Sequence, residues 1–115
     1  MSRSHAAAQK LAGAAPVFAA LGDETRLRLV ARLCADGPLS ISRLSEEADV
    51  TRQAITKHLQ ALADAGVVRD SRRGRERIWE LEPRRIESAR RALDHISAQW
   101  DSALDRLRAF VEDEE

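Results

Sequence analysis

The sequence predicts a mainly α-helical protein with one small β-hairpin and a long C-terminal helix that pairs with a second copy of the chain. Three observations support this fold class. Apolar residues recur at helical spacing through most of the chain, and two short β-type runs flank Gly74. An apolar stripe then continues at alternating spacings of three and four residues from Ile86 to Phe110. With 115 residues the chain is one domain, and dimerisation adds buried surface to a modest core.

Composition excludes several classes of protein. Charged residues make up 33% and apolar residues 43%, and no apolar run approaches the length of a membrane span, so we expect no membrane partner. No signal peptide is visible and the single Cys34 excludes an internal disulfide, which together favour the cytoplasm. The sequence shows no nucleophile with a base, no Gly-rich phosphate loop and no paired carboxylates in an apolar setting. We therefore expect no enzyme and no cofactor.

The N-terminal segments are predicted to hold the central part of the chain in place. Residues 1–14 are Ala-rich and weakly patterned, so we expect an N-terminal arm that is either helical or disordered. Pro16 can open a helix that ends near Leu21. Asp23 is the predicted N-cap of a second helix, which packs through Leu27, Leu29, Val30 and Leu33 and carries Cys34 as a small core residue.

A short helix over residues 40–48 precedes a longer helix from Thr51 to Ala65. Thr51 is a suitable N-cap for the longer helix, and Gly66 suits a left-handed stop after its last turn. Its inward stripe contains Ile55, Leu59 and Leu62. The opposite face has no apolar and no acidic member and consists of Arg52, Gln53, Thr56, Lys57 and Gln60. Two helices joined by so short a turn are typical of a helix-turn-helix unit.

The residue types on this outer face suit DNA. Arg can bind guanine through two hydrogen bonds, Gln can do the same with adenine, a Thr methyl group suits thymine, and Lys binds phosphate. After Gly66, a Gly74-centred turn between two β-type runs predicts a hairpin whose tip carries clustered arginines, which bind phosphate well. The residues predicted to contact DNA are Ser40, Ser42, Thr51, Arg52, Gln53, Thr56, Lys57, His58, Arg72, Arg73 and Arg75.

The distribution of charge supports this prediction although the net charge is zero. Residues 51–77 contain seven Lys and Arg against three Asp and Glu, whereas residues 101–115 contain two against six. One segment therefore has an excess of four positive charges and the other an excess of four negative charges. A basic segment of this kind can meet phosphate while the acidic end keeps the protein soluble.

The last helix, over residues 83–111, is predicted to be a dimerisation helix that is followed by an acidic tail at residues 112–115. At 1.5 Å per residue it is about 40 Å long, too long for a small body to cover. A second copy related by two-fold symmetry would cover its apolar stripe. The predicted contact residues are Ile86, Ala89, Leu93, Ile96, Trp100, Leu104 and Leu107, with Ala103, Phe110 and Val111 extending the stripe.

Three segments together resemble the ArsR-type winged helix-turn-helix repressors. They are FAALGDETRL at residues 18–27, the helix from Thr51 to Gly66 with its RQAITKHL core, and RGRE at residues 73–76. The similarity covers nearly all of residues 15–110, so that residues 15–82 correspond to the DNA-binding domain. It implies a homodimeric bacterial transcription factor. In particular, the chain is similar to a branch with a long, Trp-containing C-terminal helix.

The resemblance also implies that no metal site is present. Metal-sensing relatives carry a Cys-x-Cys pair in the short helix, where this chain has Ser40 and Ser42, and ligands at the start of the last helix, where it has Pro83 and Arg85. We therefore expect a sequence-specific transcriptional repressor that binds an inverted repeat as a homodimer, with no metal. Two alternatives stay open. One is a winged-helix module that binds protein without DNA, and the other is a repressor released by a metal or by an unknown small-molecule effector.

Overall fold

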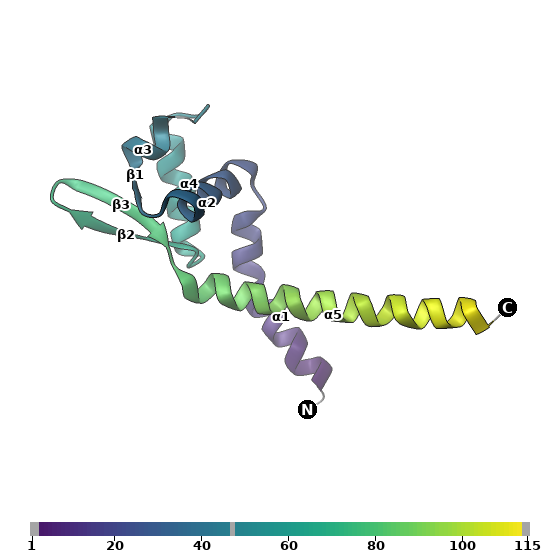
Figure 1. Ribbon diagram of the computed structural model, residues 1–115. Helices are drawn as coiled ribbons and strands as arrows, with labels where there is room; N and C mark the ends of the chain where they lie inside the picture. Colours follow the sequence, from purple (N-terminus) through teal and green to yellow (C-terminus); the bar gives the residue numbers. More distant parts are fainter. Residues whose placement is uncertain (1–2, 47, 114–115) are drawn as a thin grey trace.

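The computed structural model describes residues 3–46 and 48–113, which form five helices and three short strands. The elements are α1 (Arg3–Leu21), α2 (Glu24–Asp36), β1 (Leu39–Ser40), α3 (Ile41–Glu46), α4 (Arg52–Asp64), β2 (Val68–Arg73), β3 (Glu76–Leu81) and α5 (Pro83–Asp113). Figure 1 shows a helical body from which the β2–β3 hairpin projects on one side and α5 on the other. The fold class predicted from the sequence is confirmed.

The core lies where α2, α3 and α4 meet the base of the hairpin. Ile55, Leu59 and Leu62 recur at helical spacing on α4 and are 0% exposed, so one whole face of that helix is buried. The sheet contributes Trp79, and the other helices contribute Val17, Ala20, Leu29, Leu33 and Leu44. Because its inner face is fixed by this packing, α4 holds its opposite face in a defined orientation toward solvent.

Strand β1 was not predicted from the sequence. It pairs antiparallel with β3, with Leu39 opposite Trp79 and Ser40 opposite Ile78, and makes a sheet in the order β1-β3-β2. Two residues are too few for a period-two pattern to be visible in a sequence. The pairing ties the segment before α3 to the hairpin, and the helix that was expected from residue 40 begins at Ile41.

Helix α1 differs from the prediction that a helix opens at Pro16. The structure has one helix from Arg3 to Leu21 with Pro16 inside it. Pro removes one backbone hydrogen bond from a helix interior. Packing offsets that loss here, because Ala14, Val17 and Ala20 are buried and α1 crosses α5. Residues 3–14 of the predicted N-terminal arm are therefore helical, and residues 1–2 lie outside the described part of the chain.

Helix α2 confirms its predicted N-cap but corrects part of its predicted packing face. The Asp23 carboxylate accepts a 3.0 Å hydrogen bond from the Arg26 N–H, and Leu29 and Leu33 are buried. Leu27 and Cys34 are exposed, so the prediction that both belong to the core was wrong. Successive helical residues are about 100° apart, and both residues have turned away from the Leu29–Leu33 face.

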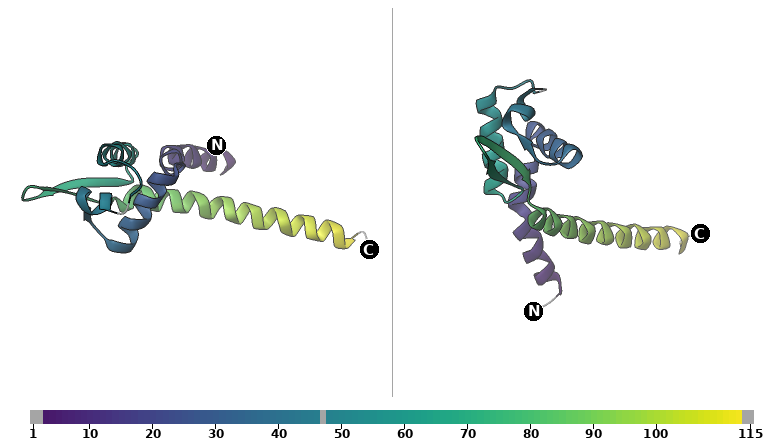
Figure 2. Two further views of the ribbon diagram at one scale, coloured as in Figure 1. Left: turned by 90° about the horizontal axis from the view of Figure 1, so that it is seen from above. Right: turned by 60° about the vertical axis from the view of Figure 1, so that its left-hand side comes forward.

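Helix α5 accounts for the elongated shape of the chain. Its 31 residues correspond to about 46 Å, and the whole chain measures 68 × 34 × 20 Å. The radius of gyration is 19.0 Å, whereas a compact domain of this length has about 13 Å. In both views of Figure 2 the distal part of α5, residues 93–113, projects from the body; we call it the C-terminal arm. The helix continues to Asp113, two residues past its predicted end at residue 111 and into the segment that was expected to be an acidic tail.

Candidate nucleic-acid interface

The N-terminus of α4 is held by its predicted cap. Thr51 has an extended backbone, and its hydroxyl accepts a 3.1 Å hydrogen bond from the Ala54 N–H. This contact satisfies one of the N–H groups that a helix start leaves without a partner. At the other end Gly66 has a φ of +79°, as expected for a left-handed stop. The helix that sequence analysis placed at Thr51–Ala65 is therefore confirmed within one residue at each end.

The outer face of α4 carries three side chains that are free to bind a ligand. Arg52, Gln53 and Lys57 are exposed, and none of them makes a side-chain hydrogen bond or ion pair with the residues that the structure describes. Thr56 is half-buried, and its hydroxyl donates to the Arg52 carbonyl at 3.0 Å. Gln60 donates to the Asp64 carboxylate at 3.0 Å. The free side chains thus concentrate in the first half of the helix.

His58, which was expected both to pack and to contact phosphate, lies on the flank of α4 that faces α2. It is half-buried, and its Nδ1 lies 3.9 Å from the Asp23 carboxylate on α2. The hydrogen bond from the Arg26 N–H holds the pKa of Asp23 below its usual value despite some desolvation, and the nearby His58 adds to this effect. Because His58 contacts its own domain in this way, we assign it to packing and leave it out of the proposed DNA contacts.

The two serines before α4 also have different roles. Ser40 is 8% exposed, and its Oγ accepts a 3.2 Å hydrogen bond from the Arg43 N–H, which caps α3. Because Ser40 is nearly buried and caps α3, we leave it out of the proposed phosphate contacts. Ser42 is exposed on α3 and stays among the predicted phosphate contacts. The cap at Ser40 agrees with the expectation that this residue starts the short helix, although the helix itself begins one residue later, at Ile41.

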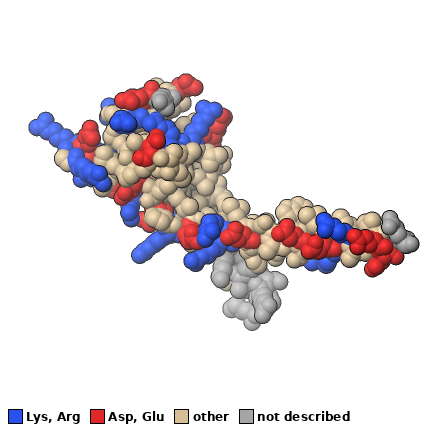
Figure 3. Space-filling model, in the orientation of Figure 1, with Lys and Arg blue, Asp and Glu red and all other residues tan. Residues whose placement is uncertain are grey.

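The arginines of the hairpin fall into two groups. Arg72, Arg73 and Arg75 surround Gly74, whose φ of +65° makes the turn, and all three are exposed without an acidic partner among the described residues. We call them the tip arginines. Basic side chains gather at the end of the hairpin, opposite the C-terminal arm with its acidic side chains (Figure 3). The tip arginines are the three that sequence analysis selected for DNA contact.

The other two hairpin arginines are used within the fold. Arg77 donates to the Asp70 carboxylate across the strands, and its guanidinium lies 4.6 Å from the centre of the Trp79 ring. Arg69 donates to Glu80 and Glu82, both at 2.9 Å. Hydrogen bonding to Glu80, followed by the charges of both acids, raises the pKa of Arg69 above its ordinary value. These pairs hold the strands together and leave the positive charge of the tip available for a partner.

On α5 the structure divides the predicted dimer contacts into two sets. Ala89 is 5% exposed and Ile86 is half-buried, and both pack against the core of the same chain. Ala89 has little surface left for a second copy, so we leave it out of the proposed interface, whereas the contact of Ile86 with a second copy stays a prediction. The remaining predicted residues are exposed on the C-terminal arm: Leu93, Ile96, Trp100, Leu104 and Leu107, with Phe110 and Val111 beyond them. Trp100, at 66% exposed, is the largest of these apolar side chains.

The structure also bears on metal binding and on membrane insertion. Within residues 3–46 and 48–113, no cluster of three or more His, Cys, Asp and Glu side chains could hold a metal ion. Among the helices of the same ranges, none is long and apolar enough to cross a membrane.

Comparison with known proteins identifies the family. The family described as "Helix-turn-helix domain" matches residues 21–70. The chain is 35% identical over 95 residues to the "HTH-type transcriptional regulator Rv2034" of Mycobacterium tuberculosis, covering 83% of this chain and 85% of that protein. The solved structure of an "ArsR-like Transcriptional Regulator" from Rhodococcus sp. RHA1 is 37% identical, has a TM-score of 0.71 and covers 86% and 92% of the two chains. The chain belongs to the ArsR-type family of winged helix-turn-helix regulators.

This ArsR-type protein is therefore a DNA-binding transcriptional regulator and not an enzyme. It is also 28% identical to the "Arsenical resistance operon repressor" of Escherichia coli over 95 residues, which cover 83% of this chain and 79% of that protein. The homodimeric winged helix-turn-helix domain Mb0332 of Mycobacterium bovis has the same fold, with 23% identity, a TM-score of 0.60 and coverage of 92% and 93%. By position in this fold, α4 is the second helix of the helix-turn-helix and the β2–β3 hairpin is the wing.

Proposed function

We propose that the protein is a homodimeric repressor that binds an inverted-repeat DNA site, with one α4 helix in the major groove of each half-site. This proposal rests on the exposed side chains Arg52, Gln53 and Lys57 on the first half of α4, none of which has a side-chain partner among the residues that the structure describes. A recognition helix contacts base edges with its N-terminal residues. Arg52 and Gln53 have the donor geometry for guanine and adenine, and Lys57 suits the adjacent phosphate.

The tip arginines would supply contacts that do not depend on sequence. Their guanidiniums are exposed on the hairpin and bind phosphate oxygens as charged donors. Arg69 and Arg77 already have acidic partners, so we do not propose them as DNA contacts. A surface that binds protein through α4 would need apolar anchors on the outer face. The exposed members of that face, Arg52, Gln53, Lys57 and Gln60, are all polar, which favours DNA over a protein partner.

The proposed dimer forms through the C-terminal arm. Seven large apolar side chains between Leu93 and Val111 are exposed there, and a continuous apolar surface of this kind marks an interface. The helix also has opposite charges at its two ends. Its first ten residues contain four Arg and one Glu, whereas residues 101–113 contain four acids and two Arg. Antiparallel pairing of two α5 helices would cover the apolar stripe and place each basic end beside an acidic end.

Such a dimer presents two recognition helices related by a two-fold axis. Helix-turn-helix dimers bind half-sites about one helical turn apart, roughly 34–36 Å between centres. Repression follows if the operator overlaps a promoter, because the bound dimer then excludes the polymerase.

The proposed location is the cytoplasm, because that is the compartment that contains the DNA of a bacterial cell.

The role of the wing is tested by Arg73→Ala. We expect this change to weaken binding to all DNA sequences alike and to lower the slope of log K against log salt by about 1, because one phosphate contact and its released counterion are lost. Fluorescence anisotropy with a specific and a scrambled duplex across a salt series measures both effects. Arg28→Ala is the charge-matched control, because Arg28 is exposed on α2 and pairs with Glu24. An unchanged salt slope for Arg73→Ala would contradict the assignment.

A further inference from the structure

The end of α4 and the start of α5 are in contact, although 18 residues separate Asp64 from Pro83 in the sequence. We call this contact region, formed by residues 66–69, 80, 82, 84 and 85, the joint. The Glu82 N–H donates to the Val67 carbonyl at 2.8 Å, which holds the chain entering α5 against the turn that leaves α4. Next to it, the Arg85 side chain packs over Gly66. A Cβ added to Gly66 would lie 2.7 Å from the Arg85 Cγ, so the two segments are in direct contact.

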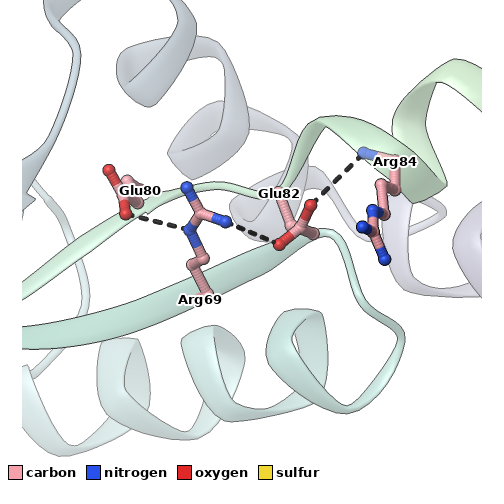
Figure 4. A network of polar contacts seen from close by, with 4 residues as sticks. All are labelled: Arg69, Glu80, Glu82 and Arg84. Carbon is pink, nitrogen blue, oxygen red and sulfur yellow. Dashed lines mark hydrogen bonds and ion pairs between the residues drawn. The ribbon is translucent and has the colours of Figure 1, made fainter.

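A series of hydrogen bonds also connects β2 to the start of α5 at the joint. Arg69 on β2 donates through Nε to Glu80 and through a terminal nitrogen to Glu82, both at 2.9 Å. The second carboxylate oxygen of Glu82 accepts from the Arg84 N–H in the first turn of α5 at 3.4 Å. Figure 4 shows these contacts running from β2 through β3 into α5. One guanidinium thus connects the wing to the start of the dimerisation helix.

Helix α5 also packs against α1, and its two buried residues are Ala89 and Ala92. Helix α5 is thus attached to the rest of the chain at two places, the contact with α1 and the joint. Two attachments define the direction of a helix, whereas a single attachment does not. The side chains of Glu80 and Glu82 are 28% and 24% exposed, and that of Arg69 is 55% exposed. An ion pair this exposed adds little to the stability of the fold. The ion pair does, however, link α5 to the DNA-binding unit, which consists of α4 and the hairpin. A change in this link would change the angle between the two.

We propose that the Arg69–Glu82 pair is a positioning contact that sets the angle between the DNA-binding unit and α5, and thereby determines which half-site spacing the dimer accepts. The inference rests on the proposed function, because it requires a dimer built on α5. In a two-fold dimer any change in this angle occurs in both subunits and moves the two recognition helices relative to each other. A dimer without the contact samples more angles and tolerates more spacings, at similar stability of each chain.

The test compares two isosteric variants with the same change of charge. Glu82→Gln removes the carboxylate that joins Arg69 to α5, whereas Asp70→Asn removes a carboxylate that pairs with Arg77 inside the same hairpin. Both remove one negative charge, so their general effect on DNA affinity is matched. Arg69→Lys keeps the charge but loses the two-pronged geometry, and we expect an intermediate result.

The DNA probe is a two-fold site selected by the wild-type protein from a random-sequence library, with one or two base pairs added at its centre. Each added pair moves the half-sites apart by about 3.4 Å and rotates them. We expect the wild type and Asp70→Asn to lose roughly tenfold or more in affinity per added pair, and Glu82→Gln to lose about threefold or less. Affinity for the unaltered site should differ little between the two variants.

A second measurement needs no DNA. Cys34 is the single cysteine of the sequence and is exposed on α2, so one spin label per subunit reports the distance between the two bodies of the dimer. We expect a broader distance distribution for Glu82→Gln than for the wild type or Asp70→Asn. If Glu82→Gln keeps both the wild-type spacing preference and the wild-type distance distribution, the positioning role is wrong. A wild type that is monomeric or selects no two-fold site would instead overturn the proposed function, and this inference with it.

Discussion

Leu104→Asp should convert the dimer to monomers and reduce operator binding by at least about a hundredfold. Leu104 is 51% exposed in the single chain, so the change costs its fold little, but the proposed pairing would bury the new carboxylate in an apolar seam. Burying an unpaired charge costs several kcal/mol. A monomer would also bind only one half-site and lose the avidity that a two-fold site provides. Sedimentation velocity and anisotropy with the operator duplex measure the two consequences.

The matched control for this prediction is Ser102→Asp. Ser102 lies half a turn away from Leu104 on the same helix and is exposed, so the variant carries the same added charge outside the apolar stripe. It should remain dimeric and bind the operator within about threefold of the wild type. Circular dichroism should show the same helical content for both variants. A Leu104→Asp protein that stays dimeric would show that the C-terminal arm is not the interface.

Arg52→Ala should produce the second largest effect, on sequence discrimination. Loss of a two-pronged contact to a base edge costs about 1–3 kcal/mol, so the preference for the operator over scrambled DNA should fall by roughly 5- to 150-fold. Gln53→Ala should behave in the same way. The measurement is the ratio of the two dissociation constants at one fixed salt concentration, because non-specific binding depends steeply on salt.

Gln60→Ala is the control for that pair of variants. Gln60 is on the same outer face but its amide is bound to Asp64 one turn further on, so its loss should change the discrimination ratio by less than about twofold. If Arg52→Ala and Gln53→Ala both leave the ratio intact while lowering all affinities, the two side chains contact phosphate and the bases are recognised elsewhere.

The elements that sequence analysis predicted well are those whose signals are local. Thr51 and Gly66 mark the ends of α4 by chemistry that acts within one helical turn, and the structure shows the cap and the left-handed stop. The hairpin follows from Gly74 between two β-type runs, and its glycine has the positive φ that the turn requires. The inner stripe of α4 is complete because its period-3.6 pattern is unbroken from Ile55 to Leu62.

The predictions that differ from the structure concern residues whose conformation or burial depends on contacts between segments that are distant in the sequence. Pro16 stays inside α1 because α5, about 70 residues further on, packs against that helix. Ala89 is buried in the core of its own chain, so the apolar stripe on α5 packs first against its own body and further on against the proposed second copy. The spacing of apolar residues does not show where the first of these contacts ends. Similarly, five arginines in the hairpin look equivalent in the sequence. Only the fold brings Glu82 and Asp70 beside Arg69 and Arg77, and within the described part of the chain it gives the tip arginines no acidic partner.

The most direct test of the proposed function is footprinting of the purified protein on DNA upstream of its own gene, across a salt series. We predict two protected half-sites of related, inverted sequence with centres about one helical turn apart, and protection that weakens steeply as salt increases. Protection of a single unpaired site would contradict the two-fold arrangement. Uniform, sequence-independent protection would contradict base recognition by the outer face of α4.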